Sequence, residues 1–320
     1  MSARVRVGIA SWADQALIES GAFYPRRSMS AQARLRWYAR FFDTVEVNAS
    51  YYAIPDVRHV ARWVERTPPG FLFNVKAYAP MTGHAARPQT LPADVLRLLP
   101  DAASRNHRDE VEADAFPPAA LDETFRLFRA SLAPLAAAGK LGYVLFQLAP
   151  WVRFGPERLA YVASLPERLP GWTVAVEFRH RSWLPERADE TLDTLRAAGV
   201  ANVVVDGPAI EAAIPRVPVV TARTAVVRLH GRNAEGWLKQ VRGEAPAVRV
   251  KYDYRYGEGE LAALLPEIER LAEESEQVVI SFNNNNRDYP VQNALMLRRM
   301  LGQPARAPAQ QQSLPRDLLA

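Results

Sequence analysis

The feature that most constrains the fold is an alternation of side chains in eight strand-like segments, separated from one another by stretches with helical spacing. In the fifth segment, Val174, Val176 and Phe178 share one face. Glu177 and Arg179 lie on the other face, near the end of the segment. The eight segments are Val5–Ala10, Thr44–Asn48, Phe71–Lys76, Gly142–Leu148, Thr173–Arg179, Ala201–Asp206, Ala225–His230 and Val278–Asn283. Such alternation predicts parallel β/α units.

The position of the polar residues within the segments distinguishes two α/β architectures. An open doubly wound sheet is covered by helices on both faces, so its central strands are apolar on both. Here one face is apolar throughout, and the other becomes polar only near the end of seven segments. A closed barrel explains this pattern, because the last inward-facing residues reach its open mouth. We therefore predict an α/β fold of the TIM-type (β/α)8 barrel class, as a single domain.

Helical spacing occurs at 30–42, 57–66, 120–138, 156–168, 186–198, 259–273 and 289–301. The link at 207–223 contains proline and is expected to lack a full helix. Residues 1–302 are the predicted barrel. Within them, 78–119 form a long insertion after the third strand, of the kind that serves as a lid or binding loop. Residues 303–320, rich in Pro, Gln and Ala, are predicted to be a flexible tail.

Composition removes several classes of site. The chain has no cysteine, which excludes a thiol nucleophile, a disulfide and cysteine-held zinc or iron–sulfur sites. Lys and Arg total 40 against 35 Asp and Glu, a mild excess that is weak support for nucleic-acid binding. No secretory signal or membrane-spanning run is recognisable, so we expect a cytoplasmic location and no membrane partner. The oligomeric state is not indicated.

Carboxylates at strand ends are the first catalytic candidates. Glu46 and Glu177 are predicted to act as general acid and base at the barrel mouth, with His230 as a third catalytic residue. The alternative is that both carboxylates form ion pairs with neighbouring cations and orient them. A divalent metal held by Glu46, Glu177, Asp206 and His230 is a further alternative, although no local metal motif is present and no cofactor is required.

Cations and neutral amides make up the predicted substrate-binding set. Lys76 suits either an imine or a charged clamp, and nearby acids favour the clamp. Arginine side chains suit phosphate or carboxylate, and amides orient ligand polar groups. His180 is either a base or a loop residue. The predicted substrate-binding residues are Asn48, Tyr51, Lys76, Gln147, Arg179, His180, Asp206, Arg228, Arg232 and Asn283.

Several motifs together give a resemblance to a known family. They are Gly8–Trp12, Phe23–Pro25, Thr44–Tyr52, Phe71–Ala77, Leu141–Leu148, Ala175–Trp183, Val227–Asn233 and Phe282–Asn285. With this order and spacing the chain resembles the YecE-like family over about residues 5–301. The resemblance implies a TIM barrel and no particular reaction, because the family is catalogued as a domain of unknown function. In that family adjacent Thr and His often follow the lysine strand, whereas here Gly83 separates Thr82 from His84, so no role is transferred to His84.

Three functions are compatible with these residues. The leading hypothesis is an enzyme that performs acid–base chemistry on a small polar anion bearing phosphate or carboxylate. The second is a nucleic-acid binder or metal-dependent phosphodiester-cleaving enzyme, with Tyr252, Tyr254 and Tyr256 as a stacking surface. The third is a non-catalytic protein that binds a metabolite in the same bowl.

Overall fold

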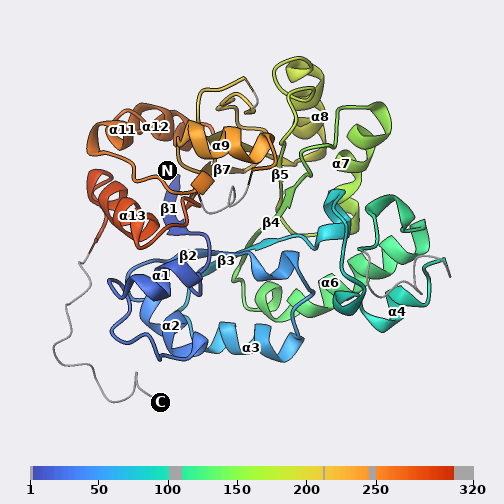
Figure 1. Cartoon of the computed structure of the whole chain (residues 1–320), viewed down its shortest axis with the longest axis horizontal. Helices are drawn as coiled ribbons and strands as arrows, with labels where there is room; N and C mark the ends of the chain where they lie inside the picture. The colour runs from blue at the N-terminus through green and yellow to red at the C-terminus, as the bar shows by residue number, and fades with distance from the viewer. Residues whose placement is uncertain (1–2, 101–109, 212, 245–249, 306–320) are drawn as a thin grey trace. The chain divides into compact units, whose positions relative to one another are not determined.

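The fold is built from eight parallel strands with helices between them (Figure 1). The computed structural model describes residues 3–100, 110–211, 213–244 and 250–305. The strands are hydrogen-bonded in the order β1-β8-β7-β6-β5-β4-β3-β2. A parallel bridge between Ala10 and Glu46 joins the end of β1 to β2 and brings the order back to its start. The strands are β1 (Arg4–Ile9), β2 (Thr44–Val47), β3 (Leu72–Lys76), β4 (Leu141–Gln147), β5 (Val174–Glu177), β6 (Ala201–Asp206), β7 (Thr224–Leu229) and β8 (Gln277–Phe282). This is the TIM-type (β/α)8 fold predicted from side-chain alternation.

Helices fill most of the links between strands. Short 3-10 helices, labelled η, follow β2 and β3 and also occur within the insertion at 78–119. The α-helices are α1 (Gln15–Ser20), α2 (Ala31–Tyr38), α3 (Val57–Glu65), α4 (Ala93–Leu96), α6 (Pro118–Ala137), α7 (Pro156–Arg168), α8 (Ala188–Ala198), α9 (Ala234–Val241), α11 (Glu258–Ala262), α12 (Leu265–Glu273) and α13 (Tyr289–Met300). The 3-10 helices are η1 (Ala49–Tyr51), η2 (Ala79–Thr82), η3 (Pro88–Thr90) and η4 (Ala113–Ala115).

The predicted elements agree with the observed ones to within a few residues, and the differences have local causes. The predicted helix at 259–273 is two helices, since Pro266 in the first turn of α12 lacks the amide hydrogen that would continue α11. Helices α1 and α9 were not predicted. The described residues of the 207–223 link contain no helix, as expected.

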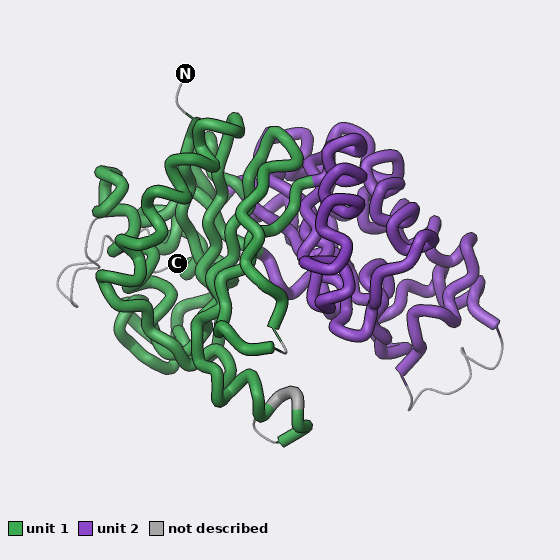
Figure 2. Tube along the Cα trace, turned by 90° about the horizontal axis from the view of Figure 1, so that it is seen from above, with its two compact units in different colours: residues 1–46, 66–72, 201–320 green, residues 47–65, 73–200 purple. Residues whose placement is uncertain are grey.

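The chain divides into two compact units, shown in green and purple in Figure 2. Unit 1 contains residues 1–46, 66–72 and 201–320, with β1, β6, β7 and β8. Unit 2 contains residues 47–65 and 73–200, with β3, β4 and β5. In each unit the strands are buried over most of their length, as expected for strands covered by helices.

The register of the strands aligns the polar residues near their ends. In unit 1, Arg228 of β7 is level with Ser281 of β8. In unit 2, Gln147 of β4 is level with Glu177 of β5. Polar side chains on neighbouring strands of each unit therefore lie at the same height, which is what allows them to pair.

The insertion at 78–119 carries η2, η3, α4 and η4. An antiparallel bridge between Ala86 and Val111 joins its two arms. Part of the insertion, 101–109, and most of the predicted tail, 306–320, lie outside the described residues, and the lid function stays a prediction. Within the described part of the chain, no helix has the length and apolar character needed to cross a bilayer.

Candidate functional site

The carboxylate of Glu46 in unit 1 is enclosed in a buried ion pair. Arg228 donates from Nε to Oε2 at 2.9 Å and from Nη2 to Oε1 at 2.6 Å. Both side chains are essentially inaccessible, at 0% and 1% exposure. A bidentate guanidinium pair of this kind occupies both carboxylate oxygens. The geometry therefore favours the alternative reading, in which Glu46 orients Arg228, over a role as general acid or base.

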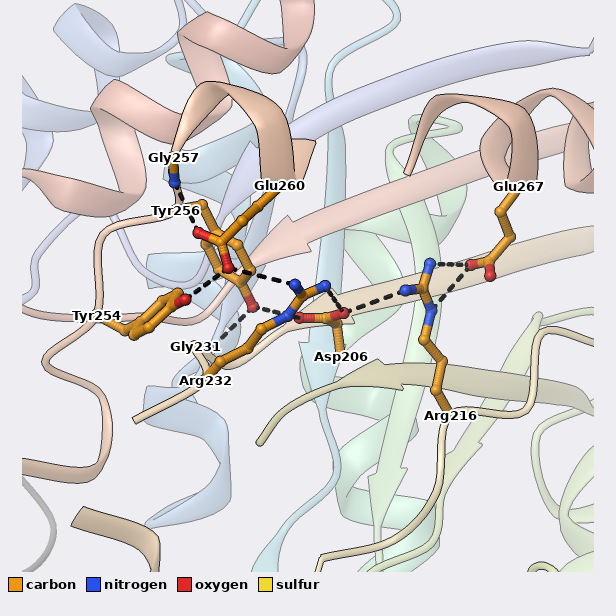
Figure 3. Close-up of polar contacts among 9 residues, drawn as sticks. All are labelled: Asp206, Arg216, Gly231, Arg232, Tyr254, Tyr256, Gly257, Glu260 and Glu267. Atoms are coloured by element: carbon orange, nitrogen blue, oxygen red, sulfur yellow. Dashed lines mark hydrogen bonds and ion pairs between the residues drawn. The ribbon is translucent and has the colours of Figure 1, made fainter. Parts of the chain in front are cut away.

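Asp206, at the end of β6, is the centre of a second network in unit 1 (Figure 3). Arg232 donates to both of its carboxylate oxygens, at 2.9 and 2.7 Å. The Tyr256 hydroxyl donates to Oδ1 at 2.7 Å, and Arg216 donates to Oδ2 at 3.3 Å. The side-chain hydrogen bonds to Asp206 raise the pKa of Arg232, so this guanidinium stays charged.

The network continues outward through alternating charges. Arg232 also donates to Glu260 of α11 at 3.2 Å, and Arg216 pairs with Glu267 of α12 at 2.6 Å. Tyr254 donates to Glu260 at 2.6 Å (Figure 3). Each charged group in this chain has an opposite neighbour, so Asp206 and Arg232 act chiefly on each other.

The three tyrosines of 252–256 do not form an open stacking surface. Tyr256 is buried, and its hydroxyl accepts a hydrogen bond from the Gly231 amide at 2.9 Å. Burial raises its pKa well above the usual value, so it stays a neutral donor. The Tyr254 hydroxyl donates a hydrogen bond to Glu260. A platform for nucleic-acid bases needs exposed rings, and the buried ring of Tyr256 cannot contribute to one.

His230 and Asn283 follow β7 and β8 and meet in unit 1. The Asn283 amide nitrogen lies 2.8 Å from Nδ1 of His230, and the imidazole is fully buried. With Asn283 donating, the ring proton of His230 resides on Nε2. Lys251 was not predicted as a site residue, yet it is buried with its ammonium 3.6 Å from the centre of the Trp237 ring, which also contacts His230.

In unit 2, Glu177, Arg179 and Gln147 form one polar group at the ends of β4 and β5. Arg179 pairs with the buried Glu177 carboxylate and donates to Gln147 Oε1 at 3.2 Å. The Arg179 side chain is itself 8% exposed. Three predicted residues, Gln147 from one strand and Glu177 and Arg179 from the next, thus come together, with Arg179 held between an acid and an amide.

A second group in unit 2 surrounds Lys76 at the end of β3. The Lys76 ammonium lies 4.4 Å from the centre of the Tyr51 ring, an arrangement that stabilises a cation. The Tyr51 ring meets His84 edge to face at 5.1 Å, and His84 meets Trp151 at 5.4 Å. Burial raises the pKa of Tyr51 to about 12, so its hydroxyl stays protonated at neutral pH.

The Thr82 hydroxyl has two hydrogen-bond partners, the Ala79 carbonyl and the His84 ring. Thr82 Oγ1 lies 2.9 Å from the Ala79 carbonyl oxygen and 2.8 Å from Nδ1 of His84. When the hydroxyl hydrogen is directed to Ala79, Nδ1 of His84 carries the ring proton and donates to Thr82. Nε2 then carries the lone pair, and within the described part of the chain it makes no hydrogen bond.

Charge and burial keep this imidazole neutral. Desolvation, followed by the positive charges of Lys76 and Arg179, lowers the pKa of His84 from 6.5 to about 4. A neutral imidazole can accept a proton on its unprotonated nitrogen. The Tyr51 ring contacts both the Lys76 ammonium and His84, which brings these residues together.

Gly83 explains why Thr82 and His84 can meet although they are not adjacent. Its φ of 79° lies in the left-handed region, and a Cβ there would stand 2.6 Å from Val152. The turn it makes closes η2 and returns the chain so that Nδ1 of His84 lies 2.8 Å from the Thr82 hydroxyl oxygen. Sequence reasoning missed His84 because one inserted glycine breaks the familiar spacing. The sequence Thr-Gly-His after a predicted strand could have indicated this contact, because glycine readily forms a left-handed turn.

Two other predicted residues have different surroundings. His180 accepts from the Ser182 amide through Nδ1 at 3.1 Å and also contacts the Ser182 hydroxyl, which favours a loop role. Asn48 follows β2, and its Oδ1 is buried without a hydrogen-bond partner among the described residues. A buried acceptor of this kind suits a donor group on a ligand.

The four residues considered as metal ligands are engaged elsewhere. Glu46 and Glu177 are paired with arginines, and Asp206 accepts from two arginines and a tyrosine. Over the residues that the structure describes, no group of three or more His, Asp or Glu side chains is arranged to hold a metal ion.

Comparisons with known proteins agree with this architecture. Residues 6–318 match the family described as "Protein of unknown function DUF72". The chain is 33% identical over 285 residues to UPF0759 protein YunF of Bacillus subtilis, covering 88% of this chain and 89% of YunF. It is 30% identical over 184 residues to UPF0759 protein YecE of Escherichia coli, covering 57% of this chain and 55% of YecE.

Solved structures of DUF72 family proteins share the fold. One from Enterococcus faecalis matches with a TM-score of 0.75 at 25% identity, over 97% of this chain and 99% of that chain. One from Thermotoga maritima matches with a TM-score of 0.69 at 26% identity, over 94% of this chain and all of that chain, 100%. The family match over nearly the whole length, the YunF relative and the shared fold lead to one conclusion: this chain belongs to the DUF72 family.

Proposed function

We propose that this protein is an enzyme that performs acid–base chemistry on a small anionic substrate bearing a phosphate or a carboxylate, and that its unit 2 residues Lys76, Arg179 and His84 form the site. The observation that carries the proposal is the pair of cations next to a neutral imidazole, whose pKa they help to lower to about 4. A lysine ammonium and an arginine guanidinium near a neutral imidazole supply the groups that bind an anion and the group that accepts a proton from it.

Lys76 and Arg179 hold the anion in this proposal. Lys76 stays a cation on the face of Tyr51, which supports a charged clamp over an imine. Glu177 and Gln147 fix the Arg179 fork, so Glu177 serves as a positioning residue. Because two partners already hold the Arg179 guanidinium, it loses little conformational entropy when it binds an oxyanion. This favours recognition of a planar or tetrahedral anion.

His84 is the proton acceptor in this proposal, in place of the strand-end glutamates. Its Nε2 carries the lone pair when Nδ1 donates to Thr82, and the rings of Tyr51 and Trp151 hold the imidazole from two sides. A bound anion would screen the two cations and raise the pKa of His84 toward its usual range, where a base is more effective. Substrate binding would thus prepare the base.

An NMR titration of His84 tests both parts of the proposal. Without ligand, the imidazole should stay neutral down to about pH 4. Saturating inorganic phosphate should raise that pKa, and the rise should shrink in Lys76→Gln and Arg179→Gln. Arg153→Gln is the control, because Arg153 lies in an exposed part of the same unit. An unchanged His84 titration in saturating phosphate would contradict the anion site.

A turnover experiment tests the base separately. Small phosphorylated and carboxylated compounds are incubated with the wild-type protein and with His84→Gln. Removing a general base lowers turnover by about 10²- to 10⁴-fold. Equal turnover by both proteins on a compound that is converted would contradict the assignment of His84.

A further inference from the structure

We infer that unit 2 carries a second ligand site, a pocket between η2 and α7 that takes a small monocation with an apolar body, such as a hydrophobic amine. The pocket has a volume of about 580 Å³. That size lies in the range of small-molecule sites, which extends from about 300 to 1,000 Å³. Lys76, Arg179 and His84 do not line the pocket, which adjoins their site through Thr82 and Trp151.

The floor of the pocket is apolar. Met81, Leu148 and Val162 line it and are almost completely buried. These side chains come from η2, from the residue after β4 and from α7, so three elements of the same unit form one continuous surface. A ligand that fills this space must present an apolar surface to it.

The polar atoms of the lining are already occupied by hydrogen bonds inside the protein. The Tyr161 hydroxyl donates to the Met81 carbonyl at 2.7 Å. The Trp151 indole donates to the Gly83 carbonyl at 3.1 Å, and the Thr82 hydroxyl donates to Ala79. These groups therefore present rings and methyl groups, and they do not supply directional donors to a ligand.

The rim of the pocket carries the charge. Among the described residues that line the pocket, Glu112, Asp114 and Glu157 are acidic and Arg158 is the one cation. All four residues are exposed, and the three carboxylates make no ion pair with any residue in the described ranges. Arg158 instead donates to the Arg153 carbonyl at 3.0 Å. The resulting excess of two negative charges favours a cationic group at the mouth.

Trp151 adds a second reason for a cation. Its indole lines the pocket but is 60% exposed, an unusual state for so large an apolar ring. Its hydrogen bond to Gly83 fixes the ring in place. An ammonium over the face of a fixed indole gains cation–π attraction. Charge at the rim, an exposed aromatic face and an apolar floor together specify a hydrophobic amine.

Three isosteric probes test the inference: phenethylamine, 2-phenylethanol and phenylacetate, titrated by isothermal calorimetry. We expect the amine to bind most tightly, the alcohol more weakly and the acid not measurably. The double variant Asp114→Asn/Glu157→Gln should weaken amine binding by about 2- to 10-fold, as expected for loss of two exposed charges, and should leave the alcohol unchanged. The amine affinity should also fall at high salt.

Two controls separate the pocket from general charge and from misfolding. Glu167→Gln/Glu186→Gln removes two exposed acids away from the pocket and should leave amine binding unchanged. Leu121→Trp fills the pocket and should abolish binding of amine and alcohol alike, whereas Val57→Trp, on the exposed side of α3, should not. Binding of phenylacetate as tight as the amine, absence of amine binding at millimolar concentration, or full binding by Leu121→Trp would each overturn the inference.

Discussion

The Asp206 network of unit 1 and the His84 group of unit 2 are built from the same kinds of residue, yet they differ in how those residues are satisfied. Around Asp206, two arginines and a tyrosine donate to one carboxylate, and the arginines in turn meet Glu260 and Glu267. Around His84, the positive charges of Lys76 and Arg179 lower the pKa of the imidazole, and Arg179 also pairs with Glu177. Charges that pair fully with one another stabilise structure, whereas the cations beside His84 are, in our proposal, the place for an anion.

The largest expected effect tests the buried ion pair between Glu46 and Arg228 in unit 1. Arg228→Met leaves the buried Glu46 carboxylate without its guanidinium, which should lower the free energy of unfolding by about 3–5 kcal/mol. Denaturant unfolding measures this loss. The double variant Glu46→Met/Arg228→Met removes both charges and should recover most of the stability. Arg126→Met, which breaks an exposed pair with Glu123, is the control and should change little. An equal loss in the single and double variants would show that packing, and not charge, sets the stability here.

The next effect concerns Asp206 itself. Asp206→Asn replaces charge-assisted hydrogen bonds with neutral ones and should lower the free energy of unfolding by about 1.5–3 kcal/mol. Asp193→Asn, in an exposed pair with Arg196, is the matched control and should cost no more than about 0.5 kcal/mol. If the two variants lose the same stability, the network in unit 1 does not stabilise the fold in the way described.

A smaller effect separates backbone strain from the His84 contact in unit 2. Gly83→Ala must place a side chain in the left-handed region and against Val152, and should lower stability by about 1–2 kcal/mol. Gly139→Ala has a similar φ of 62° with open space around its Cβ, so its loss should be smaller. Only Gly83→Ala should also move the pKa of His84, as measured by NMR. An unaltered pKa of His84 in Gly83→Ala would show that the turn at Gly83 does not determine the environment of the His84 ring.

The effect that is smallest near neutral pH, and that grows only below about pH 6.5, is the pH dependence that His84 adds to stability. Its pKa is lower in the folded protein, about 4, than the 6.5 of an exposed histidine, so between these values the unfolded chain binds a proton that the folded protein does not. The contribution is thus fully present above about pH 6.5 and is lost as the pH falls toward 4. Wild-type protein should lose more stability than His84→Gln across this interval in denaturant titrations. Parallel curves for the two proteins would contradict the lowered pKa.

The fold could be predicted from the sequence because each strand and helix is marked by the spacing of apolar residues within its own segment. Alternation along β6 and the apolar spacing of α7 each depend on a few successive residues, and both elements begin and end where the pattern does. The inclusion of Glu46, Arg179 and Asp206 among the polar strand-end residues follows from the same rule.

The partners of those residues could not be predicted in the same way. Nothing local shows that Glu46 pairs with a residue 182 positions later, nor that Asp206 receives Tyr256 as well as Arg232. His84 depends on a left-handed turn at Gly83 and on how one hydroxyl hydrogen of Thr82 is used. Such features are set by three-dimensional hydrogen bonding, which residue spacing does not encode.

The separation between Glu46 and Arg228 has a consequence for the order in which the chain matures during synthesis. Glu46 is synthesised 182 residues before its ion-pair partner Arg228. Burying the carboxylate without that partner would be strongly unfavourable. The segments of unit 2 end at residue 200, so they are complete before β7 has been made. Unit 2 can therefore pack while β7 is still to be made, whereas Glu46 has no buried ion pair until the last third of the chain has been synthesised.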